Sequence, residues 1–158
     1  LDRDILRNRI YAGTTMAAVW YGWDNGIPGP ATSPKYLAPT NQEFFAWPKW
    51  GQYYQTMGQF GEAPDLQPAQ ELMDLANDWT RAEDTQERAQ IWERMLAIHA
   101  DQQFAIGILS KAPQPVVVSN RLMNVPEDAV WAYDPGAHFG IHRIDEFYFK
   151  DPLVQVSK

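Results

Sequence analysis

The sequence predicts a mixed α/β domain in which short strands precede and follow a helical hairpin. Apolar residues recur at helical spacing over residues 66–82 and again after Asp84, with a very short link between the two segments. Short apolar runs at 16–21, 105–109 and 115–119 are typical of buried strands. The order of strand, loops, two helices and further strands is that of a mixed α/β domain.

The first part of the chain is expected to combine short helices with loops. Residues 1–11 predict a short amphipathic helix, because Ile5, Leu6 and Ile10 can share one face. The strand predicted at 16–21 runs into Asn25-Gly26, a dipeptide typical of tight turns. Two more short helices are expected near 41–47 and 50–57, within segments otherwise rich in loops.

The two central helices are expected to form an antiparallel αα-hairpin. Pro68 fits the first turn of the first helix, whose apolar stripe comprises Leu72, Leu75, Ala76 and Trp79. Asp84 can cap the second helix, and Glu87 stands at the capping-box position. The apolar stripe expected on this second helix comprises Ala89, Trp92, Met95, Leu96 and His99. A final short extended piece is expected at 147–149.

Composition and charge exclude several classes of function. The 158 residues correspond to about one domain, and their formal net charge is −7. An acidic surface repels phosphate backbones, so we expect no nucleic-acid partner. The absence of cysteine removes disulfides, thiolate zinc sites, iron–sulfur clusters and cysteine nucleophiles. No apolar run approaches the roughly 20 residues of a membrane span.

The histidines and carboxylates match no catalytic or metal motif. His138 and His142 are four residues apart in a segment that suits a strand, where ~13 Å would separate them, too far to share one metal ion. His99 lies on a helix face and is predicted to be a core or edge histidine. A glycosidase needs two carboxylates across a cleft, which nothing near Asp145-Glu146 indicates. We therefore predict no catalytic residue, metal or cofactor.

The segment that ends the first predicted strand is the candidate ligand-binding site. An indole supplies flat apolar area, and the carboxylate of Asp24 can pair with an ammonium or a hydroxyl group. In the alternative interpretation, the tryptophans belong to the core and Asp24 stabilises the Asn-Gly turn. The candidate ligand-binding residues are Trp20, Tyr21, Gly22, Trp23, Asp24 and Asn25.

Three stretches between residues 11 and 149 together hold 80 of the 158 residues, in this order: YAGTTMAAVWYGWDNGIPGPATSP, RAQIWERMLAIHADQQFAIGIL and VVVSNRLMNVPEDAVWAYDPGAHFGIHRIDEFYF. They resemble the carboxy-terminal part of the peptide-type (family 5; dipeptide, oligopeptide and nickel) extracellular solute-binding proteins of ABC importers. The resemblance implies a two-lobed fold of the periplasmic-binding-protein-like II class. Residues 1–158 would then be a single C-terminal fragment, without the N-terminal lobe.

The resemblance also implies a binding function and no enzyme activity. In such proteins the backbone around a Gly-Trp pair and a nearby Asp hold the ligand. Gly22 and Trp23 match that pair, whereas Asp24 directly follows the Trp and the family's Asp usually lies further on. An oligopeptide is therefore the expected ligand, with an oligosaccharide or an opine-like compound left open. The expected partners are ABC permease subunits in the inner membrane, and the expected location is the periplasm or the cell surface.

Two alternatives remain on sequence grounds. The aromatic residues concentrated between 11 and 60 suggest a carbohydrate-active enzyme or a carbohydrate-binding module. The acidic helical hairpin suggests a structural or adaptor domain, which would have no small-molecule ligand.

Overall fold

The computed structural model describes residues 2–20, 29–31, 33–109, 113, 115–128 and 143–150. The chain divides into two compact units, each described here by itself. The first unit comprises Leu1–Trp23 and Pro28–Gly107, and the second comprises Asp24–Ile27 and Ile108–Lys158.

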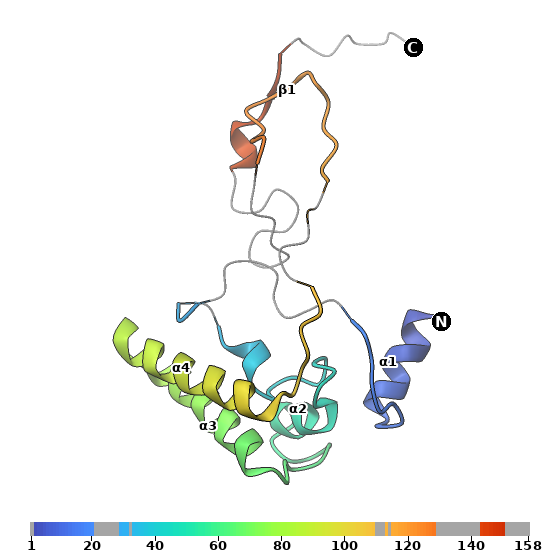
Figure 1. The fold of residues 1–158 in the computed structure, drawn as a ribbon, viewed down its shortest axis with the longest axis vertical. Coiled ribbons are helices and arrows are strands. Elements are labelled where there is room, and N and C mark those ends of the chain that lie inside the picture. The colour runs from blue at the N-terminus through green and yellow to red at the C-terminus, as the bar shows by residue number, and fades with distance from the viewer. Residues whose placement is uncertain are drawn as a thin grey trace. The chain divides into compact units, whose positions relative to one another are not determined.

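The first unit is helical in its described part, and the second contains a small antiparallel ladder (Figure 1). The helices of the first unit are α1 (Arg3–Tyr11), the 3-10 turn η1 (Lys35–Leu37), α2 (Pro48–Gln55), α3 (Gln67–Arg81) and α4 (Thr85–Gln102). The elements of the second unit are β1 (Leu122–Met123), the 3-10 turn η2 (Ile144–Glu146) and β2 (Tyr148–Phe149).

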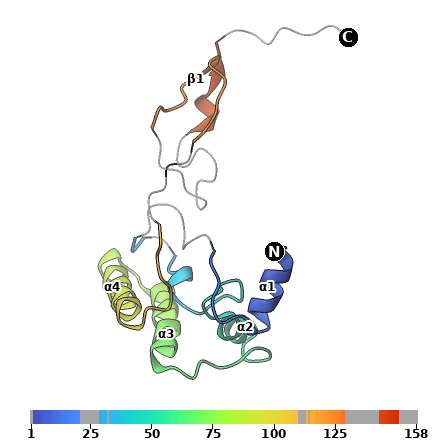
Figure 2. The same cartoon turned by 45° about the vertical axis from the view of Figure 1, so that its right-hand side comes forward.

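The predicted αα-hairpin is confirmed by α3 and α4, which lie side by side in both views (Figures 1 and 2). The Asp84 carboxylate caps α4 by accepting the N–H of Glu87 at 2.8 Å. The Glu87 carboxylate accepts the N–H of Glu83 at 3.2 Å, one residue earlier than in an ordinary capping box. Further along, Arg94 of α4 donates two hydrogen bonds to Glu71 of α3, at 2.6 and 2.8 Å. This pairing joins the first turns of α3 to the middle of α4, as an antiparallel arrangement requires.

The core of the first unit lies where the hairpin meets η1 and the residue before α2. The predicted stripe of α3 faces it, with Leu72 completely buried. The stripe predicted for α4 is partly wrong, because Leu96 is 45% exposed. The buried residues of α4 are Ile91, Met95 and Ile98, which are four and three positions apart. This spacing keeps one side of the helix facing the core. The buried cluster comprises Leu37, Ala38, Trp47, Leu72, Ala76, Ala82, Ile91, Met95 and Ile98.

His99 is half-buried and lies at the edge of this core, in agreement with the prediction of a core or edge histidine. Its Nε2 lies 2.8 Å from the carbonyl oxygen of Leu37. Because a carbonyl can only accept, Nε2 carries the proton in this bond. The centre of the imidazole ring lies 5.7 Å from the ring centres of both Trp47 and Phe104. Burial lowers the pKa of His99, and the bond to Leu37 opposes this effect.

The strands predicted at 16–21, 105–109 and 115–119 are wrong where the structure describes these residues. Their backbones form no ladder, and Met16 and Val117 are almost fully exposed. Over the described ranges, the paired strands are β1 and β2; β2 bears out the extended piece expected at 147–149, whereas β1 lies where no strand was expected. An apolar run becomes a strand only when a neighbour satisfies its N–H and C=O groups, and a local pattern does not specify that neighbour.

The helix predicted near 41–47 is also wrong, whereas the helix predicted near 50–57 is confirmed as α2. Turns at 42–43 and 45–46 occupy this segment instead. The side-chain carbonyl oxygen of Asn41 accepts a hydrogen bond from the backbone N–H of Glu43 at 2.8 Å. This local bond competes with helical hydrogen bonding and favours a turn. The fold class as a whole, including its relation to two-lobed binding proteins, stays a prediction.

Candidate functional site

Among the six predicted ligand-binding residues, the structure describes Trp20. The other five (Tyr21, Gly22, Trp23, Asp24 and Asn25) lie outside the described residues. The half-buried ring of Trp20 lies 4.9 Å from that of Phe45, and the Arg3 guanidinium lies 5.4 Å from the Trp20 ring centre. The rings of Phe45 and Tyr11 form a T-shaped pair with their centres 6.2 Å apart. Trp20 is thus anchored in an aromatic cluster of three rings (Tyr11, Trp20 and Phe45).

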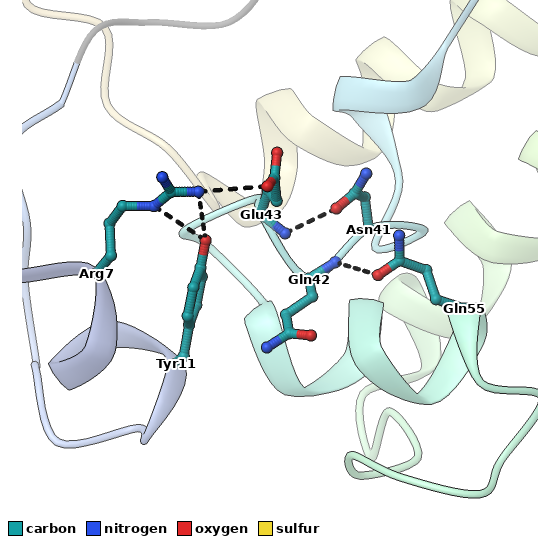
Figure 3. Close-up of a pocket in the computed structure, with 6 residues that line it drawn as sticks. All are labelled: Arg7, Tyr11, Asn41, Gln42, Glu43 and Gln55. Atoms are coloured by element: carbon teal, nitrogen blue, oxygen red, sulfur yellow. Dashed lines mark hydrogen bonds and ion pairs between the residues drawn. The ribbon is translucent and has the colours of Figure 1, made fainter. Parts of the chain in front are cut away.

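A polar hollow adjoins this cluster and shares Tyr11 with it (Figure 3). Its volume is about 420 Å³. The lining side chains come from α1, from the turns before α2 and from the last residue of α2. They are Arg7, Tyr11, Asn41, Gln42, Glu43 and Gln55.

Arg7 is the cation of the hollow and is held by two partners. Its Nε and Nη2 donate to the Tyr11 hydroxyl at 3.2 and 3.0 Å, and its Nη2 also donates to Glu43 Oε1 at 3.3 Å. Arg7 and Tyr11 are four residues apart on α1, so their side chains share one face of the helix. The bond to Tyr11 is the main cause that raises the pKa of Arg7, and the charge of Glu43 adds to it. The guanidinium is therefore an oriented, permanent positive charge.

The opposite wall of the hollow is the turn at residues 41–42, which packs against α2. The side-chain oxygen of Gln55 accepts the N–H of Gln42 at 3.0 Å. Gly51 of α2 comes so near the same turn that a Cβ there would lie 2.2 Å from the carbonyl oxygen of Asn41. Only glycine permits this approach, so Gly51 and Gln55 together set the position of the wall.

The lining side chains keep polar atoms that the described bonds do not use. In the view of Figure 3, the amide nitrogens of Asn41 and Gln55, one nitrogen of Arg7 and one oxygen of Glu43 point to the same side, while the Gln42 amide points away. The hollow thus presents several donors and one anionic acceptor together. Such a set can hydrogen-bond a small polar molecule.

The other candidate groups do not assemble a catalytic or metal centre in the part that the structure describes. Asp145 and Glu146 are exposed and pair with Arg143 at 2.7 and 2.8 Å. Over the described ranges, no three His, Asp or Glu side chains are arranged to hold a metal ion. His138 and His142 lie outside those ranges.

Four tryptophans of the first unit besides Trp20 serve internal packing in the described residues. Trp47 is buried in the core, and three others pack against it: Trp50, Trp79 and Trp92. The indole N–H of Trp79 donates to the carbonyl of Pro30 at 3.0 Å, and the Arg88 guanidinium lies 4.9 Å from the Trp79 ring centre. These four tryptophans therefore contribute to the core of the first unit.

The residues of the hollow were not predicted as functional. One local signal existed, because Arg7 and Tyr11 stand four apart in a segment expected to be helical. Glu43 joins them from 36 residues away. No local pattern reports such a long-range meeting.

Comparison with known proteins identifies no relative: no family model, no curated protein and no solved structure matches this chain. Over the residues that the structure describes, none of the helices has the length and apolar character needed to cross a bilayer.

Proposed function

We propose that the chain belongs to the solute-binding component of a peptide-type ABC importer, located in the periplasm or at the cell surface. The observation that carries this proposal is the set of three stretches quoted above. They resemble the carboxy-terminal part of these binding proteins in order and spacing, and they hold 80 of the 158 residues.

Exposed apolar segments support the proposal. In the first unit, Met16 and Val19 are exposed on an extended segment without a neighbouring strand in the described residues. In the second unit, Val116 and Val117 are likewise exposed on an extended segment. Segments of this kind normally pair with further strands, because unpaired apolar edges invite association. A two-lobed binding protein would supply such strands from additional chain.

The described tryptophans favour a peptide ligand over the carbohydrate alternative. A carbohydrate platform needs exposed aromatic faces, whereas Trp47 is buried and Trp79 is covered by Arg88. Recognition of a peptide main chain relies instead on backbone groups and a carboxylate. Trp23 and Asp24 are the residues that we propose for this role, on the strength of the resemblance.

The mechanism we propose is ligand capture between two lobes. A ligand that touches both lobes only in the closed state shifts the equilibrium toward closure. The closed, loaded protein then delivers its solute to the permease. Binding and closure are coupled because the ligand's extra contacts exist in one state alone.

A thermal-shift screen of the full-length protein tests the proposal against peptides, oligosaccharides and opines. A ligand at about 100 times its Kd adds about 2.7 kcal/mol to the free energy of unfolding, which is readily detected. We expect a shift with peptides that is lost in Trp23→Ala and Asp24→Asn. The matched control is Asp78→Asn, an exposed carboxylate on α3. A folded protein that shifts with none of the three classes would contradict the proposal.

A further inference from the structure

The hollow beside α1 places a positive and a negative side chain next to each other. Arg7 Nη2 lies 3.3 Å from Glu43 Oε1, and each group retains an unused polar atom within the described residues. The guanidinium keeps Nη1, and the carboxylate keeps Oε2. Because the two charges are adjacent, an approaching molecule meets both of them at once.

The two charges together define which ligands are favoured. A simple anion is attracted by Arg7 and repelled by Glu43, and a simple cation experiences the reverse. A neutral polyol forms no ion pair with either group, and its hydrogen bonds to them only replace hydrogen bonds to water. A molecule that carries an ammonium and a carboxylate close together can pair with both groups, so both of its charges are stabilised.

Two side-chain amides add neutral donors to the hollow. In the view of Figure 3, Glu43 stands between Arg7 and the amides of Asn41 and Gln55, whose side-chain oxygens accept backbone N–H groups. Their amide nitrogens can donate to other polar atoms of a bound molecule. The free volume, about 420 Å³, falls in the range of about 300–1,000 Å³ typical of small-molecule sites.

We propose that this hollow, formed by Arg7, Glu43, Asn41 and Gln55, binds a small zwitterion of the α-amino-acid type. Arg7 receives the carboxylate, Glu43 receives the ammonium, and the two amides offer neutral hydrogen bonds beside them. The site consists of residues of the first unit alone and does not depend on the proposed importer function. It is also distinct from the residues Gly22, Trp23 and Asp24 that the resemblance assigns to solute capture.

An NMR titration of the isotopically labelled chain tests this site with four probes. They are L-alanine, N-acetyl-L-alanine (carboxylate only), L-alaninamide (ammonium only) and glucose (neither charge). We expect saturable shifts with L-alanine at the backbone amides of residues 41–43 and on α1. The two single-charge analogues should bind about tenfold more weakly, since each lacks one charge-assisted pair. Glucose should cause no saturable shift.

Two conservative variants separate the two charges. Arg7→Gln should weaken L-alanine and N-acetyl-L-alanine about tenfold and leave L-alaninamide unaffected, whereas Glu43→Gln should weaken L-alanine and L-alaninamide and leave N-acetyl-L-alanine unaffected. The matched controls are Arg81→Gln and Asp78→Asn, which alter an exposed ion pair of α3 with atoms 3.6 Å apart. Circular dichroism verifies that each variant is folded.

Three results would overturn the proposal. One is the absence of saturable shifts with L-alanine at millimolar concentrations. Another is equal binding of L-alanine and both analogues, which would show that binding does not depend on the charges of Arg7 and Glu43. The last is a loss of binding in the α3 control variants equal to that in the Arg7 and Glu43 variants. The comparison of analogues uses the unaltered chain, so it tests the proposal even if a variant does not fold.

Discussion

The close approach of α2 to the turn at Asn41 makes Gly51→Ala the most informative single change. A Cβ at position 51 would lie 2.2 Å from the carbonyl oxygen of Asn41, 2.3 Å from its carbonyl carbon and 2.7 Å from the N–H nitrogen of Gln42. All three are backbone atoms, so no flexible side chain can move away. Restoring an ordinary contact distance of about 3.5 Å requires the turn and the helix to separate by about 1 Å.

Two opposing effects decide the sign of the change. Alanine at a helical position gains up to about 1 kcal/mol over glycine from helix propensity. Overpacking a site that must shift backbone costs about 1–3 kcal/mol. The cost should win here because the clash involves backbone on both sides. We expect Gly51→Ala to lower the free energy of unfolding by about 1–2 kcal/mol and to weaken any ligand held by the hollow.

Urea unfolding measures this change as a lower midpoint with an unchanged slope. The matched control is Gly107→Ala, where a Cβ meets nothing within 4 Å. This control should be as stable as the natural sequence. If Gly51→Ala instead stabilised the protein, as propensity alone predicts, the close approach and the wall of the hollow built on it would be refuted.

Three further changes test other parts of the first unit by urea unfolding. Burial lowers the pKa of His99 below its ordinary value of about 6.5, so the unfolded chain binds the proton more tightly than the folded one. The free energy of unfolding should therefore rise with pH up to about 6.5 and level off above. His99→Gln should remove this pH dependence, and an identical pH dependence in the variant would contradict the reasoning. Asp84→Ala should cost about 1 kcal/mol by leaving the N–H of Glu87 uncapped, and Asp84→Ser should restore most of the loss; equal stability of all three would refute the cap. Gln103 has a φ of 51° at the end of α4, so Gln103→Gly should stabilise the protein by about 0.5–1 kcal/mol, and a destabilised variant would show that the side chain matters more than the backbone.

The hairpin was predictable because its signals are local. Pro68 and Asp84 mark helix starts, and the spacing of Leu72 and Ala76 defines a buried face within one helix. The cap at Asp84 needs an N–H only three residues away. Such features depend on a few neighbouring residues, so a single sequence reveals them.

The strands and the hollow were not predictable because both depend on long-range partners. The run around Val117 is apolar and β-branched, yet its backbone has no neighbour in the described residues with which to pair. Arg7 and Glu43 meet through the packing of α1 near α2, across 36 residues of chain. The turn at Asn41 also depended on a competition between its side chain and helical bonding, which composition does not decide.

The three-residue link between α3 and α4 has a consequence for the order of folding. Contacts across a hairpin with so short a link join residues that are near in sequence, so little loop entropy is lost when they form. We expect the hairpin to be structured in the folding transition state, with η1 and Trp47 docking on it later. Changes at the hairpin core, such as Met95→Ala, should therefore slow folding, whereas changes at Gly51 should mainly accelerate unfolding. The short link thus makes α3 and α4 the nucleus on which the rest of the first unit condenses.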